Sequence, residues 1–150
     1  MFFVFWESEG TAAIESATSD DDEAFTNENT PPKNCIDGDP DTLCESTKTG
    51  VTLTVKTKET ENISGVEITI NPENRDALLN ATVFVDGKKC ATITEIPKTV
   101  VTKLIVKCEG GPIQGSTVTI KTAQDKKLSL KELEIVTAPT EGNNIWNIFL

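Results

Sequence analysis

The chain has 150 residues, of which 24 are acidic and 14 basic, so its formal net charge is −10. Its length is typical of a single domain. The excess of acid repels phosphate backbones and anionic lipid, which argues against a nucleic-acid-binding or membrane-surface protein. The chain contains no His and no Tyr, which removes His-ligated metal sites and common general bases, so we expect a protein that is not an enzyme.

The two ends of the chain are apolar. Residues 1–10 carry five apolar side chains after Met1 with no basic residue before them, and we interpret this segment as either a signal remnant or an edge strand. Residues 140–150 form a second apolar stretch, which is too short for a lipid-anchor signal. Residues 11–139 lie between them as the expected domain. Its beginning, residues 11–32, is polar and acidic, and this composition indicates a solvated loop.

From Gly50 onward, short segments of alternating apolar and polar residues are separated by turn residues. The alternation predicts strands at residues 51–57, 65–71, 81–86, 90–94, 100–108, 116–122 and 128–137. The chain has 22 Thr residues, and Thr recurs at every second position in two of these segments, which is typical of strands with one solvated face. No helical periodicity stands out, so the prediction is an all-β, antiparallel β-sandwich without a membrane span.

The alternation also predicts which side chains face the core. The expected core residues are Val66, Ile68, Ile70, Val83, Val85, Leu104, Val106, Val118 and Ile120. Asp86-Gly87 predicts a two-residue hairpin turn between two of the strands. In the last strand, Leu128 and Leu130 set a parity that Leu133 and Ile135 violate, which predicts a β-bulge near Lys131-Glu132.

Four cysteines, Cys35, Cys44, Cys90 and Cys108, allow three disulfide connectivities, and the sequence alone does not select one. Cys90 and Cys108 lie in two predicted strands that a bond can bridge, whereas Cys35 and Cys44 flank an acidic loop. The even count favours an oxidising compartment, so we expect a secreted protein. Two sequons, at Asn62 and Asn80, agree with this expectation and predict a glycoprotein. The alternative is a cytosolic protein with buried thiols and chance sequons.

The segment Asn34–Asp41 places three carboxylates at alternate positions of a turn, a density of oxygen ligands that suits Ca²⁺. It is not an EF-hand, because Thr42 and Lys48 stand where that loop needs a Gly and a Glu. The alternative interpretation is a turn whose acidic side chains only form local hydrogen bonds.

Several segments together resemble a known family. They are Asn34–Asp41, Gly65–Ile70, Arg75-Asp76, Asn80–Val85, Gly115–Ile120 and Leu128–Ile135. In this order and spacing they resemble the fucolectins, or F-type lectins, which belong to the galactose-binding-like, discoidin-type β-sandwiches. The resemblance implies a jelly-roll topology and favours a bond between Cys90 and Cys108.

The resemblance also implies a calcium ion that joins the acidic turn to the last strand. The implied ligands are the carbonyls of Asn34, Asp37 and Lys131, the side chains of Asp39 and Glu132, and a hydroxyl near Ser46 or Thr47. The predicted bulge near Lys131-Glu132 coincides with the end of this site on the last strand.

The family's sugar site is only partly present. Its members hold fucose with one His and two Arg; Arg75-Asp76 matches the first Arg and its Asp, whereas Leu78 or Leu79 replaces the second Arg and no His exists. Each lost charge-assisted hydrogen bond is worth about 1.5 to 3 kcal/mol. We therefore expect a calcium-stabilised carbohydrate-binding module with altered specificity for a glycan or glycoprotein. The alternative is a lectin-derived structural or protein-interaction module, monomeric or homo-oligomeric, that binds partners through its apolar ends.

Overall fold

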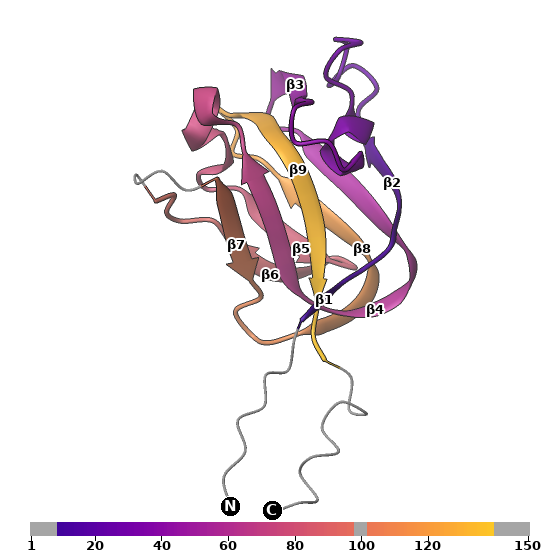
Figure 1. Cartoon of the computed structure of the whole chain (residues 1–150). Helices are drawn as coiled ribbons and strands as arrows, with labels where there is room; N and C mark the ends of the chain where they lie inside the picture. The colour runs from indigo at the N-terminus through magenta and orange to yellow at the C-terminus, as the bar shows by residue number, and fades with distance from the viewer. Residues whose placement is uncertain (1–8, 98–101, 140–150) are drawn as a thin grey trace, which may run out of the picture.

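The computed structural model describes residues 9–97 and 102–139, and these residues form an antiparallel β-sandwich, which confirms the predicted fold class (Figure 1). The strands of the described residues are β1 (Gly10–Thr11), β2 (Ile14–Ser19), β3 (Cys44–Thr49), β4 (Thr52–Ile70), β5 (Thr82–Val85), β6 (Lys88–Thr92), β7 (Lys103–Lys107), β8 (Ile113–Lys121) and β9 (Lys127–Thr137). Two short 3₁₀ helices, η1 (Pro32–Ile36) and η2 (Pro72–Leu78), connect strands at one end of the sandwich. In the described part of the chain, no helix is long and apolar enough to cross a membrane.

The long strand β4 belongs to both layers of the sandwich. Its first part pairs with β2 and β8, and its last part pairs with β7 and β9. The front layer in Figure 1 is therefore β7-β4-β9, with β1 and β3 added along β9, and the back layer is β2-β4-β8-β5-β6. The prediction of two strands, at residues 51–57 and 65–71, was wrong in this respect. The polar residues between them pass through a register shift without ending the strand.

The core lies between the two layers. All nine residues predicted for it are buried, and Leu53, Ile63, Leu133 and Ile135 join them. The hairpin prediction is also confirmed. Asp86 and Gly87 have φ values of 47° and 81° between the paired residues Val85 and Lys88, as a two-residue turn of this kind requires.

The predicted bulge in β9 is present. Glu132 pairs with Thr69 and Leu130 pairs with Ile70, so Lys131 has no residue opposite it. Because of this extra residue, Leu130 and Leu133 are both buried although they are three positions apart.

The prediction of a solvated loop over residues 11–32 was wrong for β2. Ile14 and Ala17 are partly buried against the core, and the remaining side chains of this polar strand are too hydrophilic to give a strand signal. The acidic run Asp20–Glu23 itself is exposed, as expected. Of the N-terminal segment, Gly10 takes part in edge strand β1, which pairs with β9. The remaining apolar residues of both ends, residues 1–8 and 140–150, lie outside the described residues.

Both pairs of cysteines form disulfides. Cys90 is joined to Cys108, which agrees with the resemblance, and Cys35 is joined to Cys44, a pairing that the sequence had left open. The first bond connects β6 to the end of β7, which are edge strands of the two layers. The second bond ties η1 to the start of β3 and so fixes the ends of the acidic turn.

Candidate functional site

The acidic turn follows η1 and is closed by hydrogen bonds among its own residues. Asp37 Oδ1 accepts a bond from the Asp39 N–H at 2.9 Å, and Asp37 Oδ2 accepts one from the Thr42 hydroxyl at 2.6 Å. Asp39 Oδ1 accepts a bond from the Asp41 N–H at 2.9 Å. These contacts are the local bonds expected of an acidic turn, and they leave the second side-chain oxygen of Asp39 without a bond inside the turn.

The turn meets β9 at Glu132, 94 residues from Gly38. The Gly38 N–H donates a 2.7 Å bond to Glu132 Oε2, whereas the buried Oε1 atom has no hydrogen-bond partner in the described structure. Burial raises the pKa of the Glu132 carboxyl to about 7, the Gly38 bond opposes this rise, and the carboxylates of Asp37 and Glu134 add to it. An unpaired buried carboxylate oxygen beside a second carboxylate is unfavourable unless a proton or a cation neutralises it.

The bulge in β9 places Glu132 where it can reach the turn. With Lys131 as the extra residue, Glu132 lies opposite Thr69, while the next residue, Leu133, points into the core. A β-bulge redirects the side chains that follow it. The same feature that restores the core parity of β9 therefore presents a carboxylate to the turn.

The structure brings together only some of the predicted calcium ligands. Asp37 and Asp39 lie in the turn, and Lys131 and Glu132 lie beside Gly38 on the wall of one pocket. Asn34 lies on η1, three residues before Asp37, and its side-chain amide donates to the Asn29 and Leu43 carbonyls at 3.1 Å, so only its main-chain carbonyl suits the expected role.

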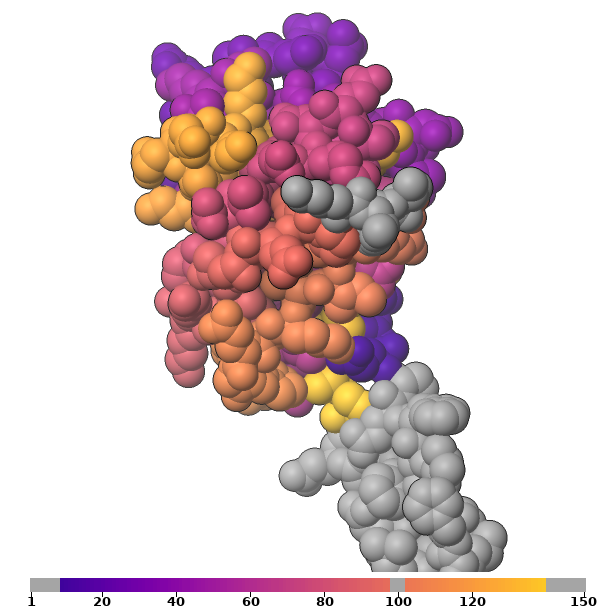
Figure 2. All heavy atoms as spheres, turned by 90° about the vertical axis from the view of Figure 1, so that its left-hand side faces the viewer, coloured from indigo at the N-terminus to yellow at the C-terminus, as the bar shows by residue number. Residues whose placement is uncertain are grey.

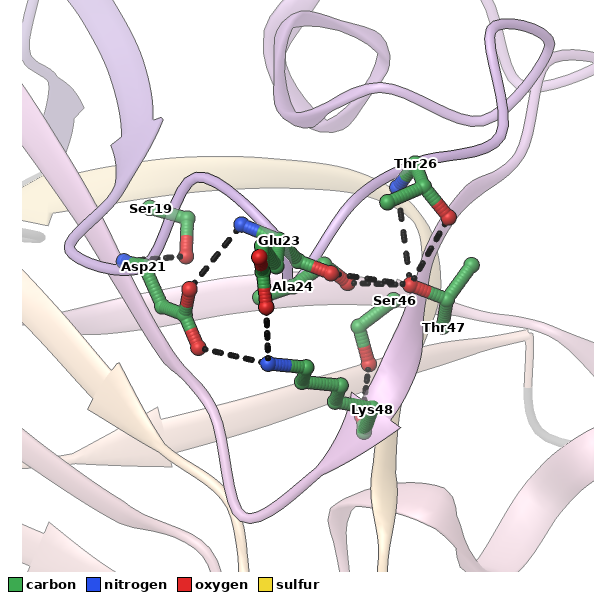
Figure 3. Close-up of polar contacts among 8 residues, drawn as sticks. All are labelled: Ser19, Asp21, Glu23, Ala24, Thr26, Ser46, Thr47 and Lys48. Atoms are coloured by element: carbon green, nitrogen blue, oxygen red, sulfur yellow. Dashed lines mark hydrogen bonds and ion pairs between the residues drawn. The ribbon is translucent and has the colours of Figure 1, made fainter.

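The structure does not bring Ser46 and Thr47 to the turn. The Ser46 hydroxyl donates to the Lys48 carbonyl and accepts from the Leu128 N–H, and Thr47 Oγ1 donates to the Ala24 carbonyl, as Figure 3 shows in part. Both hydroxyls thus attach β3 to its neighbours. The hydroxyl present at the turn is that of Thr42, which the sequence analysis used only to exclude an EF-hand.

Lys48, at the centre of Figure 3, fixes the exposed acidic run to β3. Its Nζ atom lies 3.1 Å from Glu23 Oε2 and 3.3 Å from Asp21 Oδ2. The hydrogen bonds to Glu23 and Asp21 raise the pKa of Lys48, and the Glu23 N–H and Lys48 together lower the pKa of Asp21. Lys48 therefore offsets part of the negative charge of Asp21 and Glu23.

Within residues 9–97 and 102–139, no group of three or more Asp, Glu or Cys side chains converges closely enough to hold a metal. A metal site at the turn would therefore need main-chain or hydroxyl oxygens in addition to carboxylates. Among the carboxylates predicted as calcium ligands, Glu132 has one buried oxygen without a hydrogen-bond partner in the described structure, and the exposed Asp39 uses only Oδ1 in the bonds of the turn. The remaining ligands would be main-chain carbonyls and the Thr42 hydroxyl, which are oxygen ligands that Ca²⁺ accepts and softer metals do not prefer.

A pocket of about 520 Å³, here called the turn pocket, opens between the acidic turn, the front layer and η2. It is lined by Gly38, Pro40, Asp41, Thr69, Ile70, Pro72, Arg75, Thr102, Lys103, Lys131, Glu132 and Glu134. Arg75, predicted to bind a sugar, thus shares a pocket with Glu132, predicted to bind calcium. The strand residues of this wall were not predicted, because their proximity in space depends on the pairing register of β4, β7 and β9.

Arg75 is also held by the segment that follows β6. Its Nη2 atom donates a 2.8 Å bond to the Pro97 carbonyl, and Arg75, Asp76, Ile96 and Pro97 line a smaller pocket of about 250 Å³. Figure 2 views the molecule from the side of β6 and β7 and shows η2 at the upper part of this face. Arg75 therefore lines both pockets, of which the turn pocket is the larger, whereas Asp76 lines only the smaller one.

Several solved structures are similar in fold to this chain. No protein-family model matches the chain, and no curated protein matches it. A fucolectin from the serum of the striped bass, Morone saxatilis, matches with a TM-score of 0.68 and 18% identity; the match covers 82% of this chain and 45% of the fucolectin chain.

Two other matches cover nearly the whole neighbour. A mutant of the lectin binding domain of lectinolysin, solved with Lewis b, has a TM-score of 0.66 at 19% identity over 88% of this chain and 98% of that one. The family 32 carbohydrate-binding module of Clostridium perfringens NanJ, solved with galactose, has a TM-score of 0.61 at 17% identity over 84% and 98%. At these identities the likeness shows the fold. The chain has the galactose-binding-like β-sandwich fold that fucolectins and family 32 carbohydrate-binding modules share.

Proposed function

We propose that this chain is a secreted, non-catalytic carbohydrate-binding module whose acidic turn is stabilised by Ca²⁺ and whose ligand occupies the turn pocket. The proposal rests on the carboxyl group of Glu132 at the wall of the pocket. One of its oxygens accepts a hydrogen bond from the Gly38 N–H of the turn, and the other is buried without a hydrogen-bond partner in the described structure. A cation beside this oxygen would replace the repulsion between Glu132 and Asp37 with attraction.

The proposed calcium ligands come from two distant parts of the chain. The turn supplies the Asp39 carboxylate, the Thr42 hydroxyl and main-chain carbonyls, including those of Asn34 and Asp37, and β9 supplies the Lys131 carbonyl and the Glu132 carboxylate. Bound there, Ca²⁺ supplies positive charge and links the turn to the front layer. The residues of the chain then hold the rim of the pocket in one shape, which lowers the entropy cost of binding a ligand.

The turn pocket offers the groups that a sugar needs. Arg75 provides N–H donors, Asp41 and Glu134 provide carboxylate acceptors, and the exposed Pro72 provides an apolar surface for the C–H face of a sugar ring. Its volume of about 520 Å³ lies in the range of small-molecule sites. The donor set differs from the one His and two Arg of the fucolectins, so the proposal includes an altered specificity.

Secretion is supported by the two disulfides and by the two sequons. Disulfides persist in oxidising compartments, and both pairs of cysteines in the chain are bonded. Asn62 and Asn80 are both exposed, so each is accessible to a glycan. The alternative, a protein-interaction module, relies on the apolar ends, which lie outside the described residues.

A glycan array probed in millimolar Ca²⁺ and again in EDTA tests the proposal. We expect binding to a restricted set of glycans, which weakens in EDTA and is lost in Arg75→Gln. Lys33→Gln, which also removes one positive charge but lies on η1 outside the turn pocket, should retain binding. Circular dichroism of each variant establishes that it is folded. A folded, calcium-loaded protein that binds no glycan would overturn the proposal and favour the protein-interaction module.

A further inference from the structure

The acidic turn contains the only Asp-Pro sequence of the chain, Asp39-Pro40. The carboxylate of an Asp side chain can reach the main-chain carbonyl carbon of its own residue, where it acts as an intramolecular nucleophile. Pro40 has no N–H, so the nitrogen on the other side of this bond is that of a tertiary amide, which is more basic than other peptide nitrogens and leaves more easily. This peptide bond therefore joins a nucleophile to a good leaving group.

The side chain of Asp39 is held beside this bond. Its Oδ1 atom accepts the Asp41 N–H at 2.9 Å, and the ring that this hydrogen bond closes contains the Asp39–Pro40 bond itself. The Oδ2 atom of Asp39 takes no part in the hydrogen bonds of the turn. Asp39 and Pro40 are both exposed, so water reaches the bond. The carboxylate is thus restrained close to the carbonyl while one of its oxygens is not used by the turn.

The main-chain carbonyl of Asp39 is polarised by Thr42. Its oxygen accepts a hydrogen bond from the Thr42 N–H at 3.3 Å and lies 3.0 Å from Thr42 Oγ1. The same hydroxyl lies 2.6 Å from Asp37 Oδ2, so its single proton can turn from Asp37 to the carbonyl oxygen as negative charge develops there. Two donors at one carbonyl oxygen are the arrangement that stabilises a tetrahedral oxyanion.

Two contacts outside this bond hold the turn in shape. The Cys35–Cys44 disulfide closes the segment on both sides of the bond, and the Gly38 N–H is bonded to Glu132 of β9. Holding a nucleophile close to its carbonyl speeds an intramolecular reaction relative to a flexible chain. The folded turn should therefore react faster than the same residues in the unfolded chain.

We propose that the protein hydrolyses its own Asp39–Pro40 bond, with the Asp39 carboxylate as the nucleophile. Asp39 Oδ2 bonds to the main-chain carbonyl carbon of Asp39, and the carbonyl oxygen becomes an oxyanion that Thr42 holds. The carbon–nitrogen bond then breaks, and the Pro40 nitrogen keeps the electron pair and takes a proton from water. The remaining hydroxide adds to the cyclic anhydride left on Asp39, which opens to one side-chain and one C-terminal carboxyl group. One water molecule is consumed in total, and no oxidant or other co-reactant is needed.

The two products of this reaction stay joined. The bond lies between Cys35 and Cys44, so their disulfide connects residues 1–39 to residues 40–150 after cleavage. Pro40 lines the turn pocket, and its new N-terminal amine adds a positive charge to that lining. The proposal does not rest on the proposed function, because the reaction needs neither calcium nor a ligand.

Intact-mass spectrometry of the full chain, incubated in EDTA in a mildly acidic buffer near pH 5, tests this proposal. The buffer supplies the proton that the Pro40 nitrogen needs. We expect the mass to increase by one water molecule before reduction, and we expect two chains after reduction, one ending at Asp39 and one beginning at Pro40. Asp39→Asn should abolish the reaction. Asp22→Asn, a matched control at an exposed Asp outside the turn, should react as the wild type does.

Two comparisons separate a reaction promoted by the fold from the ordinary lability of an Asp-Pro bond. Cleavage of the folded protein should be at least about tenfold faster than cleavage in urea with the disulfides intact. Thr42→Val should slow it at least about tenfold, and Thr42→Ser, which keeps the hydroxyl, should restore it. Circular dichroism establishes that each variant is folded.

Three results would overturn the proposal: an uncleaved chain, equal rates in the folded protein and in urea, or a folded Thr42→Val protein that reacts as fast as the wild type. Because all samples contain EDTA, none of these results bears on calcium binding or on the turn pocket. Failure of this proposal would therefore leave the proposed function intact.

Discussion

Replacing Glu132 with Gln should stabilise the calcium-free protein at alkaline pH. The pKa of Glu132 is about 7 in the fold, above its ordinary value of 4.5, so the folded state disfavours the ionised form. Its contribution to stability is therefore fully present below about pH 4.5 and is lost as the pH rises through 7. The neutral amide that Glu132→Gln introduces resembles the protonated carboxyl, so the variant should keep this contribution at every pH.

The magnitude follows from the same pKa difference. A rise from 4.5 to about 7 corresponds to at most about 3 kcal/mol, and the partial exposure of Glu132 in the turn pocket reduces this to about 1 to 2 kcal/mol. Urea denaturation in EDTA near pH 5 and pH 8 measures the effect. We expect the variant to match the wild type near pH 5 and to exceed it by that amount near pH 8. In calcium the order should reverse, because the variant loses a charged ligand.

Glu109→Gln is the matched control, since it neutralises an exposed carboxylate that is not among the groups that raise the pKa of Glu132. It should leave the pH dependence of unfolding close to that of the wild type. A Glu132→Gln protein that is less stable than the wild type near pH 8 in EDTA, by an amount independent of pH, would refute the reasoning.

Three further predictions test the fold by urea denaturation. Gly65→Ala should cost at least about 3 kcal/mol, because a Cβ atom there would lie 2.0 Å from the Val106 carbonyl oxygen; a loss below about 1 kcal/mol would show that β4 and β7 can separate at no great cost. Removing the disulfide with Cys90→Ala and Cys108→Ala should cost about 3 kcal/mol, and unchanged stability would contradict its structural role. Asp86→Ala should cost about 1 to 2 kcal/mol by breaking two hydrogen bonds to N–H groups of β8, and Asp86→Asn should lose less.

The sequence was most informative where one chemical pattern decides the outcome. Val66, Ile68 and Ile70 alternate with polar residues, and only a half-buried strand buries all three. The bulge could be predicted for the same reason, because Leu130 and Leu133 cannot face one core without an extra residue. Strand β2 could not be predicted, because its polar side chains stay in solvent and its pairing with β4 is a property of the backbone.

The site was less predictable because it depends on tertiary register. The expectation of a hydroxyl near Ser46 or Thr47 came from the family resemblance. In this chain the Cys35–Cys44 bond fixes the start of β3, and Thr42, which precedes that strand, supplies the hydroxyl at the turn. The sequence also did not predict that Arg75 and Glu132 line one pocket, because this depends on the pairing of the end of β4 with β9.

Calorimetric titration of Ca²⁺ into EDTA-stripped protein, combined with thermal melts of the same samples, tests the central claim most directly. We predict one site per chain in the wild type and in Glu134→Gln, and loss of that site in Glu132→Gln and in Asp39→Asn. At a hundredfold excess of Ca²⁺ over Kd, binding should stabilise the wild type by about 2.7 kcal/mol, which raises Tm by roughly 5 to 10 °C for a domain of this size. Absence of binding heat, together with identical melts in calcium and EDTA for a folded and metal-free sample, would contradict the claim that a calcium ion joins the acidic turn to β9.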